Sequence, residues 1–444
     1  MIRRMATEEH AMPRFPDGFL WGVSTSAHQI EGAADERERS VWDAFTAEPG
    51  RVKDGSTAEV ACDHYHRYRE DVSLLAGLGV DAYRFSVSWP RVRADKGLDF
   101  YDRLVDELLT AGVRPVPTLF HWDLPVALEE KGGWLERDTA SRFAEYVSVV
   151  ADRLGDRVKK WITLNEPAEH TLFGHALGAH APGKQLMFDA LPAAHHQLLG
   201  HGLAVQALRA SGATDIGIAN SHGPTWPASQ DQPDVEAADF YDLLLNRLFA
   251  EPILLGEYPS GLGDLMPGDV AADLKVISEP LDFYGVNYYA PTRVGAPQGE
   301  DIEFGGLTIP AELPFSVQEI EGVPVTDFGW PVVPEGLTEL LTAFHERYGD
   351  RLPPVVITEN GCSYEGVDDQ DRIAYLDGHV RALHKAVEAG VDVRGYFVWS
   401  LMDNFEWAEG YARRFGLVHV DFETLARTPK ASYGWYRDLL RAQR

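Results

Sequence analysis

Two glutamates stand in the same kind of setting, far apart in the chain. Glu166 lies in Thr-Leu-Asn-Glu-Pro (163–167) and Glu359 in Ile-Thr-Glu-Asn-Gly (357–361), each just past a short apolar run. A carboxylate is costly to bury without a partner or a task. Two carboxyls that flank a glycosidic bond can cleave it: one protonates the leaving oxygen, and the other attacks the anomeric carbon or activates water. A single glutamate in this setting is more often solvated or structural. The hypothesis that the two glutamates cleave a glycosidic bond therefore depends on the other residues at the ends of the apolar runs.

Other polar and aromatic side chains also follow apolar runs. They are Gln29, Arg84, Trp89, His121, Trp122, Asn165, Asn287, Tyr288, Tyr289, Asn360 and Trp399. Tryptophans also occur in polar contexts at positions 330 and 407. A pyranose ring offers a flat C–H face to an aromatic platform while polar side chains bind its hydroxyls, so this mixture favours a sugar ligand. A tryptophan taken at random is usually a core residue, and we expect Trp161, in Lys-Lys-Trp-Ile-Thr, to be one.

The elements that position these residues alternate along the chain. Short β-branched or aromatic runs predict strands at 19–23, 82–89, 114–120, 160–164, 215–219, 283–287, 355–358 and 395–399. Amphipathic stretches between them predict helices that include 101–111, 140–153, 195–210 and 373–389. Eight repeats predict an α/β fold, a single (β/α)₈ TIM barrel with extended βα loops. A doubly wound open sheet is the alternative on pattern alone.

A barrel would bring the chemistry together, because the carboxyl ends of its strands form one face and active sites lie there. Residues distant in sequence, such as Glu166 and Glu359, would then converge. The longest irregular stretch, 295–331, follows the sixth predicted strand, so we expect it to be an active-site loop rather than a linker. Residues 1–14 predict a flexible N-terminal extension without the apolar segment of a signal peptide, which leaves 15–444 as one catalytic domain.

The composition excludes several kinds of partner. The chain has 40 Lys and Arg against 69 Asp and Glu, a formal charge of −29, which argues against nucleic acid and anionic membrane surfaces. No stretch approaches the ~20 apolar residues of a membrane span. Cys62 and Cys362 give neither a disulfide framework nor a metal-ligand spacing, so we expect a cytoplasmic protein. The histidines follow no zinc-enzyme spacing, and we expect no metal and no other cofactor.

At these motifs the chain resembles glycoside hydrolase family 1, the β-glucosidase family. The likeness runs from Phe-Pro-Asp-Gly-Phe-Leu-Trp-Gly (15–22) to Ser-Tyr-Gly-Trp-Tyr (432–436). The other motifs that carry it are Gln-Ile-Glu-Gly (29–32), Tyr-Arg-Phe-Ser-Val-Ser-Trp-Pro-Arg (83–91), His-Trp-Asp-Leu-Pro (121–125), Asn-Glu-Pro (165–167), His-Ala-Pro-Gly (180–183), Asn-Tyr-Tyr (287–289), Thr-Glu-Asn-Gly (358–361) and Trp-Ser-Leu-Met-Asp-Asn-Phe-Glu-Trp (399–407). No single motif suffices, but as a set they are specific.

The resemblance implies a role for each matching position. Glu359 matches the nucleophile and Glu166 the general acid/base of a reaction that retains the anomeric configuration. Substrate-binding positions are Gln29, His121, Trp122, Asn165, Asn287, Tyr289, Trp330, Trp399, Glu406 and Trp407. Within this set Trp399 matches the platform under the sugar, and Asn287 and Trp330 lie toward the aglycone. Arg84 and Tyr289 match the pair that contacts the nucleophile.

Individual residues in the motifs limit the range of compatible substrates. Glu406 and Glu409 would repel a phosphate, so a non-phosphorylated sugar is favoured. The family often has Trp after Asn-Glu-Pro, whereas this chain has Ala168 followed by Glu169, which leaves the aglycone preference open. The loop after Arg91 is short and predicts a lower barrel rim.

Three functions are compatible with these residues. The first is hydrolysis of terminal β-D-glucosyl residues from cellobiose, short cello-oligosaccharides and aryl β-glucosides, with side activity on β-galactosides or β-fucosides. The second is transglycosylation, which needs the same two glutamates. The third is a non-catalytic carbohydrate-binding barrel, against which the intact pair argues. In each case the partner is a small-molecule β-glycoside, and a homo-oligomer is also compatible with the sequence.

Overall fold

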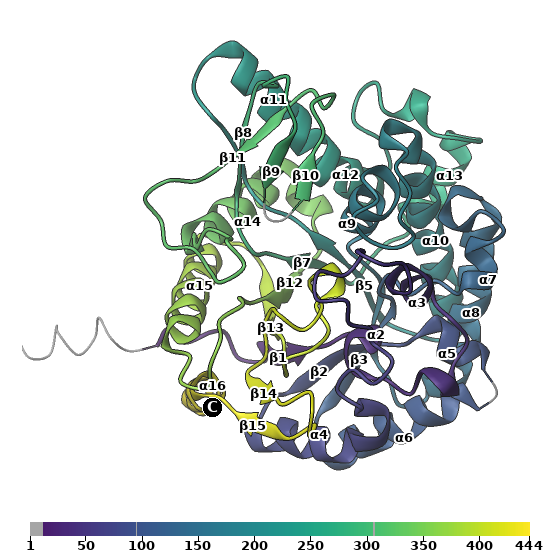
Figure 1. The fold of residues 1–444 in the computed structure, drawn as a ribbon, viewed down its shortest axis with the longest axis vertical. Helices are drawn as coiled ribbons and strands as arrows, with labels where there is room; N and C mark the ends of the chain where they lie inside the picture. The colour runs from purple at the N-terminus through teal and green to yellow at the C-terminus, as the bar shows by residue number, and fades with distance from the viewer. Residues whose placement is uncertain (1–11, 95, 305–306) are drawn as a thin grey trace, which may run out of the picture.

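Eight parallel strands close into a barrel in this computed structural model, which describes residues 12–94, 96–304 and 307–444 (Figure 1). In barrel order the strands are β1 (Leu20–Ser24), β2 (Ala82–Ser86), β3 (Arg114–Phe120), β4 (Lys160–Asn165), β5 (Asp215–Ser221), β7 (Phe283–Asn287), β12 (Val355–Asn360) and β13 (Val393–Trp399). The first strand pairs with both β2 and β13. The predicted (β/α)₈ barrel is therefore confirmed, and the open sheet is excluded.

One predicted strand boundary was wrong. The second strand was expected to continue to Trp89, but it ends at Ser86. Ser88 caps a short helix, α5 (Trp89–Arg93), because its side chain accepts a hydrogen bond from the backbone N–H of Arg91, and proline occupies an early position of that helix. The capping signal in Ser-Trp-Pro-Arg thus outweighed the aromatic and β-branched run before it.

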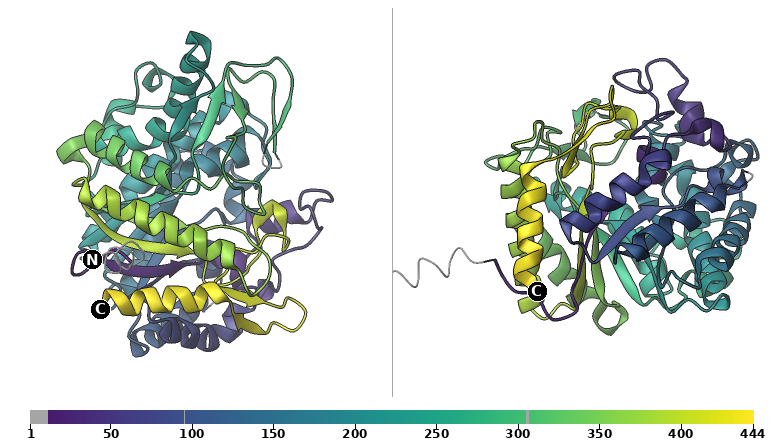
Figure 2. Two further views of the ribbon diagram at one scale, coloured as in Figure 1. Left: turned by 90° about the vertical axis from the view of Figure 1, so that its left-hand side faces the viewer. Right: turned by 90° about the horizontal axis from the view of Figure 1, so that it is seen from below.

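Helices connect the strands and cover the barrel. The longer ones are α4 (His64–Leu78), α6 (Gly97–Thr110), α8 (Asp138–Leu154), α10 (Leu191–Ala210), α11 (Gln232–Asp242), α12 (Leu248–Leu254), α13 (Val270–Ile277), α14 (Pro334–Tyr348), α15 (Gln370–Glu388) and α16 (Ala431–Gln443). The four predicted helices correspond to α6, α8, α10 and α15. Figure 2 shows α16, in yellow, beside α15, so the C-terminal end of the chain packs on the barrel.

Short helices lie in the loops at the barrel mouth. They are α2 (Ala27–Ile30), α3 (Val41–Thr46), α7 (Val126–Glu129) and α9 (Pro167–Glu169), with the wider helical turns η3 (His170–Ala176) and η5 (Leu243–Arg247). Glu166 and the residues of α9 and η3 thus form one continuous connection after β4.

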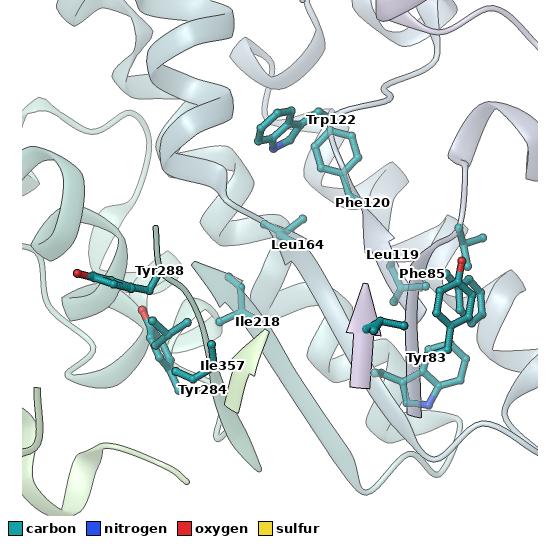
Figure 3. Close-up of a cluster of buried hydrophobic side chains, with 14 of the residues drawn as sticks. Tyr83, Phe85, Leu119, Phe120, Trp122, Leu164, Ile218, Tyr284, Tyr288 and Ile357 are labelled. Atoms are coloured by element: carbon teal, nitrogen blue, oxygen red, sulfur yellow. The ribbon is translucent and has the colours of Figure 1, made fainter. Parts of the chain in front are cut away.

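The barrel interior is filled by one apolar side chain from each strand. This inner cluster consists of Leu20, Ala82, Val116, Ile162, Ala219, Phe283, Val356 and Phe397. Side chains alternate between the two faces of a strand, so neighbouring residues such as Tyr83 and Tyr284 point outward to the helices. Figure 3 shows part of this outer layer. Trp161, predicted to be a core residue, is fully buried in it.

The stretch 295–331 is a mostly irregular loop that contains short strands. It includes β9 (Ile302–Phe304), β10 (Leu307–Ile309) and β11 (Ser316–Gln318), and β11 joins β8 (Thr292–Gly295) and β6 (Thr225–Pro227) in a small sheet. Figure 1 shows this sheet with α11 at the top of the view, beyond the end of the barrel. A further hairpin is formed by β14 (Val418–Val420) and β15 (Arg427–Pro429).

Two sequence predictions concern the ends of the chain and membranes. Residues 1–11, most of the predicted N-terminal extension, lie outside the described residues. Just after them, the carbonyl oxygens of Pro13 and Arg14 accept hydrogen bonds from Gln443 and His384. Across the described ranges, no helix combines the length and the apolar character that crossing a bilayer requires.

Candidate active site

Polar and aromatic side chains follow the inner apolar cluster along the same face of the barrel strands. Because side chains on one face recur every second residue, Arg84 stands above Ala82 on β2. By the same spacing Trp399 stands above Phe397, and Asn287 is four residues above Phe283. All three residues are buried; Asn287 and Trp399 are the last residues of their strands, and Arg84 is the third of the five residues of β2. The strands therefore direct these three side chains into the interior of the barrel at its open end.

The two glutamates reach that mouth through local irregularities. Glu359 pairs with Asn287 of β7 after a register shift in β12, and Asn165 pairs with Ala219 after a similar shift in β4. A bulge adds a residue and re-aims the side chains beyond it. Glu166 follows β4 directly, with a backbone φ of 45°. Both glutamates are buried, at 6% exposure for Glu166 and 3% for Glu359.

Glu359 is held by two donors. Arg84 Nη1 donates a hydrogen bond to Oε1 at 2.5 Å, and the Tyr289 hydroxyl donates to Oε2 at 2.7 Å. A buried carboxylate is stable only when it is paired and hydrogen-bonded, and here each oxygen has its own donor. The arrangement fits an ionised carboxylate with a fixed orientation. Each of its oxygens accepts one hydrogen bond and keeps a further lone pair that can attack a substrate.

Glu166 is in the opposite electrostatic situation. Burial raises its pKa well above the usual value, and the charges of Glu359 and Glu169 raise it further. A hydrogen bond from Asn287 Nδ2 to Glu166 Oε1, at 2.8 Å, and the Arg84 charge oppose part of this rise in pKa. The raised pKa favours the protonated form of Glu166, which is the form a general acid needs. Two carboxyls with such different settings suit acid and nucleophile roles.

A short network joins the two glutamates. Arg84 Nη2 donates to Asn165 Oδ1 at 2.6 Å, and Asn287 Nδ2 donates to the same oxygen at 3.0 Å. Arg84 also contacts Glu359, and Asn287 also contacts Glu166. Side chains from β2, β4, β7 and β12 thus connect the two carboxyls across the barrel mouth, and the structure brings Glu166 and Glu359 into one hydrogen-bonded network.

His121 contributes a neutral ring to the site. Its Nε2 accepts a hydrogen bond from Asn165 Nδ2 at 3.1 Å. Burial, and then the Arg84 charge, hold the His121 pKa well below its usual value. The proton of the neutral ring therefore sits on Nδ1, which is buried and has no hydrogen-bond partner among the described residues. A buried donor of this kind is available to a ligand hydroxyl.

Aromatic rings enclose the space around His121. Its ring stacks on Trp399, with centroids 5.8 Å apart, and on Trp407 at 5.9 Å. Trp122 lies 4.8 Å from Trp407, and its indole N–H donates to the Asn165 carbonyl at 3.0 Å. Trp330 is half-buried and packs against Tyr289 at 5.2 Å. All four tryptophans predicted to bind sugar are thus connected to the glutamate pair.

Gln29 and Glu406 complete the predicted set. Gln29 Nε2 donates to Glu406 Oε2 at 3.3 Å and to the Phe405 carbonyl at 3.0 Å. Glu406 is half-buried. Burial and the charges of Glu359 and Glu409 raise the Glu406 pKa to about 8, against the effect of the Gln29 hydrogen bond. Glu406 is therefore mostly protonated at neutral pH and can donate a hydrogen bond as well as accept one.

Backbone strain also concentrates here. Trp122, Glu166 and Trp407 have φ values of 73°, 45° and 49°. Such left-handed conformations cost a non-glycine residue ~1–3 kcal/mol and persist only where the surroundings impose them. In this chain these conformations orient the rings of Trp122 and Trp407 and the carboxyl group of Glu166.

Glu169 is a site residue that the sequence reasoning did not identify as functional. Burial raises its pKa to about 7, opposed by a hydrogen bond with Ser221, and its charge acts on Glu166. The signal in the sequence was its position three residues after Glu166. Trp42 was also missed; it packs on Trp407 at 4.5 Å and supports that ring from behind.

Comparison with known proteins identifies the family to which this fold belongs. The family model described as glycosyl hydrolase family 1 matches residues 11–444. The chain belongs to glycosyl hydrolase family 1. The resemblance noted in the sequence motifs is thus confirmed over nearly the whole length.

Relatives and solved structures of family 1 match the chain almost end to end. It is 43% identical to beta-glucosidase A of Thermotoga maritima, over 96% of this chain and 98% of that one. It is 47% identical to thermostable beta-glucosidase B of Thermobispora bispora, over 96% and 90%. The crystal structure of the psychrophilic beta-glucosidase BglU from Micrococcus antarcticus superposes with a TM-score of 0.92 at 46% identity, covering 97% and 98%.

Proposed function

We propose that this family 1 enzyme is a retaining β-glucosidase, with Glu359 as nucleophile and Glu166 as general acid/base. The observation that carries the proposal is the contrast between the two linked carboxyls. Glu359 accepts hydrogen bonds from Arg84 and Tyr289, while the raised pKa of Glu166 favours the protonated form of that group. Retaining enzymes separate the two carboxyls by ~5–5.5 Å, and we expect that separation here.

The first half of the reaction forms an ester. A Glu359 oxygen attacks the anomeric carbon from the α face of a β-glucoside, and the bond from that carbon to the aglycone oxygen breaks. Glu166 gives its proton to the departing oxygen, which leaves as an alcohol. The developing positive charge on the sugar ring is stabilised by the nearby carboxylate.

The second half reverses the roles of Glu166. Once Glu359 is an ester, its negative charge is gone, and one cause of the raised Glu166 pKa disappears with it. Glu166, now a carboxylate, takes a proton from water as the water oxygen attacks the anomeric carbon from the β face. The ester bond breaks, Glu359 becomes a carboxylate again, and glucose is released in the β configuration.

The residues around the pair support a glucosyl unit as substrate. Gln29, His121, Asn165, Glu406 and Trp407 supply donors and acceptors for hydroxyls, and Trp399 supplies the flat surface beneath the ring. The two Glu406 oxygens can serve two adjacent hydroxyls in more than one configuration. A relative named bifunctional beta-D-glucosidase/beta-D-fucosidase, from Bifidobacterium breve, is 41% identical over 95% of this chain and supports side activity on β-fucosides.

We expect cellobiose, short cello-oligosaccharides and aryl β-glucosides as substrates. A relative named 1,4-beta-D-glucan glucohydrolase, from Thermotoga neapolitana, is 42% identical over 97% of this chain, which supports a place in the degradation of cellulose fragments. The free, buried cysteines Cys62 and Cys362 fit a reducing compartment such as the cytoplasm. We also infer that residues 15–444 form one catalytic domain, because α16 packs on both α15 and α4.

Azide rescue tests the two roles separately. The substrate is 2,4-dinitrophenyl β-glucoside, whose leaving group needs no proton. In Glu359→Gly, azide enters on the vacated α face, so turnover returns with α-glucosyl azide as product. In Glu166→Ala, the ester still forms and azide attacks its β face, so the product is β-glucosyl azide. The opposite pairing of variant and anomer, read by NMR, would reverse the roles, and a wild type that releases no phenol would refute the function.

A further inference from the structure

Thr358 is an additional residue in β12, next to the proposed nucleophile Glu359. In the pairing of β12 with β7, Ile357 lies opposite Val286. The next pair joins Glu359 to Asn287, so Thr358 has no partner of its own on that strand. An extra residue of this kind is a β-bulge, which changes the direction of the side chains beside it. Consequently Thr358 and Glu359, although adjacent, are both buried, and both contact residues of the site.

The main chain of Thr358 is held by side chains from two other strands. Its carbonyl oxygen accepts a hydrogen bond from Ser24 Oγ of β1 at 2.9 Å and another from Arg84 Nη1 of β2 at 3.0 Å. Its side chain extends over β7, where a Cβ added to Gly285 would lie 3.0 Å from Thr358 Oγ1 and 2.9 Å from its Cγ2. The glycine therefore leaves the room that this side chain occupies, and the Thr358 hydroxyl has a fixed place.

The Thr358 hydroxyl holds one end of the Asn287 amide. It donates a hydrogen bond to Asn287 Oδ1 at 2.6 Å, and no second donor to that oxygen is found among the described residues. The other end of the amide carries the two N–H groups, which donate to Asn165 Oδ1 at 3.0 Å and to Glu166 Oε1 at 2.8 Å. Asn287 is fully buried. Without the hydroxyl its oxygen would be a buried acceptor with no donor, which is costly, so the amide would move.

The amide N–H on Glu166 contributes most when Glu166 releases its proton. An N–H donor stabilises a carboxylate more than a carboxylic acid, and it also fixes the rotation of the carboxyl group. Glu166 becomes a carboxylate as the leaving oxygen takes its proton. Among the charged groups around it, Glu359 and Glu169 disfavour that carboxylate, and Arg84 favours it. Tyr289 also lies close enough for its hydroxyl to interact with the Glu166 charge.

We propose that Thr358 is a positioning residue for the general acid/base. Its hydroxyl fixes the Asn287 amide, and that amide holds Glu166 in the orientation from which it protonates the leaving oxygen. The proposal rests on the function proposed above and adds a residue to its mechanism. Thr358 acts through Asn287 rather than on the substrate. A single bulge in β12 thereby sets the geometry of both carboxyls, because it presents Glu359 and also supports Glu166.

Two leaving groups separate this role from a general loss of structure. Cleavage of 2,4-dinitrophenyl β-glucoside needs no proton from Glu166, whereas phenyl β-glucoside needs one, because phenoxide is a much poorer leaving group. Thr358→Val replaces the hydroxyl by a methyl group of similar size. From the cost of an unsatisfied buried acceptor, we expect kcat/KM for phenyl glucoside to fall about 5- to 50-fold, and kcat/KM for dinitrophenyl glucoside to change by less than about twofold.

The pH profile gives a second readout. A weaker N–H contact destabilises the Glu166 carboxylate, so the Glu166 pKa rises and kcat/KM for phenyl glucoside persists to higher pH. The basic limb in Thr358→Val should lie about 0.5–1 pH unit above that of the wild type. Thr358→Ser keeps the hydroxyl and should restore both properties. The matched control is Thr163→Val, since the Thr163 hydroxyl bonds to His201 at 2.7 Å, away from the two glutamates, and both properties should stay at wild-type values.

The outcomes separate this proposal from the function on which it rests. If Thr358→Val does not fold, Thr358→Ala also lacks the hydroxyl and should show the same selective loss, at least about threefold. An equal loss for the two glucosides, or a basic limb that stays in place, would overturn the role of Thr358 and leave the β-glucosidase function intact. A Thr358→Ser variant as impaired as Thr358→Val would do the same. A wild type that cleaves neither glucoside would refute the function, and the positioning role with it.

Discussion

Replacing Glu169 by glutamine should move only one side of the pH–activity profile. Glu169 has a pKa of about 7 and its charge raises the pKa of Glu166. Hydrolysis requires Glu166 protonated, so kcat/KM is lost as the pH rises through the Glu166 pKa. Above its own pKa of about 7, Glu169 is ionised, and its charge then raises the Glu166 pKa. Glu169→Gln removes this charge, lowers the Glu166 pKa, and shifts the basic limb to lower pH.

The size of the shift follows from the spacing of the two carboxyls. Glu169 ends α9 and Glu166 directly precedes it, so we take roughly 7 Å as the distance between the two carboxyls, slightly more than the Cβ spacing of residues three apart within a helix. At an effective dielectric constant of about 20, two unit charges at that distance interact by about 2 kcal/mol. Because Glu169 is half-exposed, solvent screens part of this, and we expect a shift of about one pH unit. The acid limb of the pH–kcat/KM profile lies where Glu169 is already protonated and neutral. Glu169→Gln removes no charge there, so this limb should not move.

The assay is kcat/KM for p-nitrophenyl β-glucoside between pH 4 and 10 at constant ionic strength. Glu145→Gln is the matched control, since it makes the same charge change at an exposed position of α8, where solvent and salt screen the effect. A basic limb that stays in place in Glu169→Gln, or that moves equally in Glu145→Gln, would refute the proposed coupling between Glu169 and Glu166.

Three further substitutions test the site and its support. Tyr289→Phe removes the 2.7 Å donor to Glu359; a hydrogen bond to a charged group contributes about 1.5–3 kcal/mol, so kcat/KM should fall 10- to 100-fold with an unchanged circular dichroism spectrum. Glu406→Ala removes partners for two sugar hydroxyls, and kcat/KM for glucosides should fall at least 100-fold, while azide leaves the loss unrepaired. Lys430→Met removes the 2.8 Å partner of the fully buried Asp403, which keeps His419 at 3.2 Å and Arg414 at 3.6 Å; unfolding in urea should show a loss of about 1.5–3 kcal/mol, and a loss below about 1 kcal/mol would contradict that reading.

The fold was predictable from sequence because its strands are buried on both faces. Such strands read as short, nearly continuous apolar runs, and the helices between them bury one face, as α6 does with Phe100, Leu104 and Leu108. All eight barrel strands were located in this way. The small sheet of β6, β8 and β11 was not predicted, because strands of three or four residues show no periodicity and their pairing partners are distant in the chain.

The sequence predicted which residues form the site, but not the hydrogen bonds and charge interactions among them. Residue types at strand ends indicated the two glutamates, and the motifs indicated the sugar-binding set. The use of one Asn165 oxygen by both Arg84 and Asn287 depends on the register of strands that are distant in the chain. The raised pKa of Glu169 depends on packing around it, which no local pattern encodes.

The most direct test of the account is to trap the ester on Glu359. In 2,4-dinitrophenyl 2-deoxy-2-fluoro-β-glucoside, the fluorine slows both steps, while the activated leaving group keeps the first step faster than the second. The enzyme should release one equivalent of phenol, lose activity, and carry the fluoroglucosyl group on the peptide that contains residue 359, as read by mass spectrometry after digestion. A label on Glu166, or steady turnover with release of α-configured sugar and no label, would contradict the account.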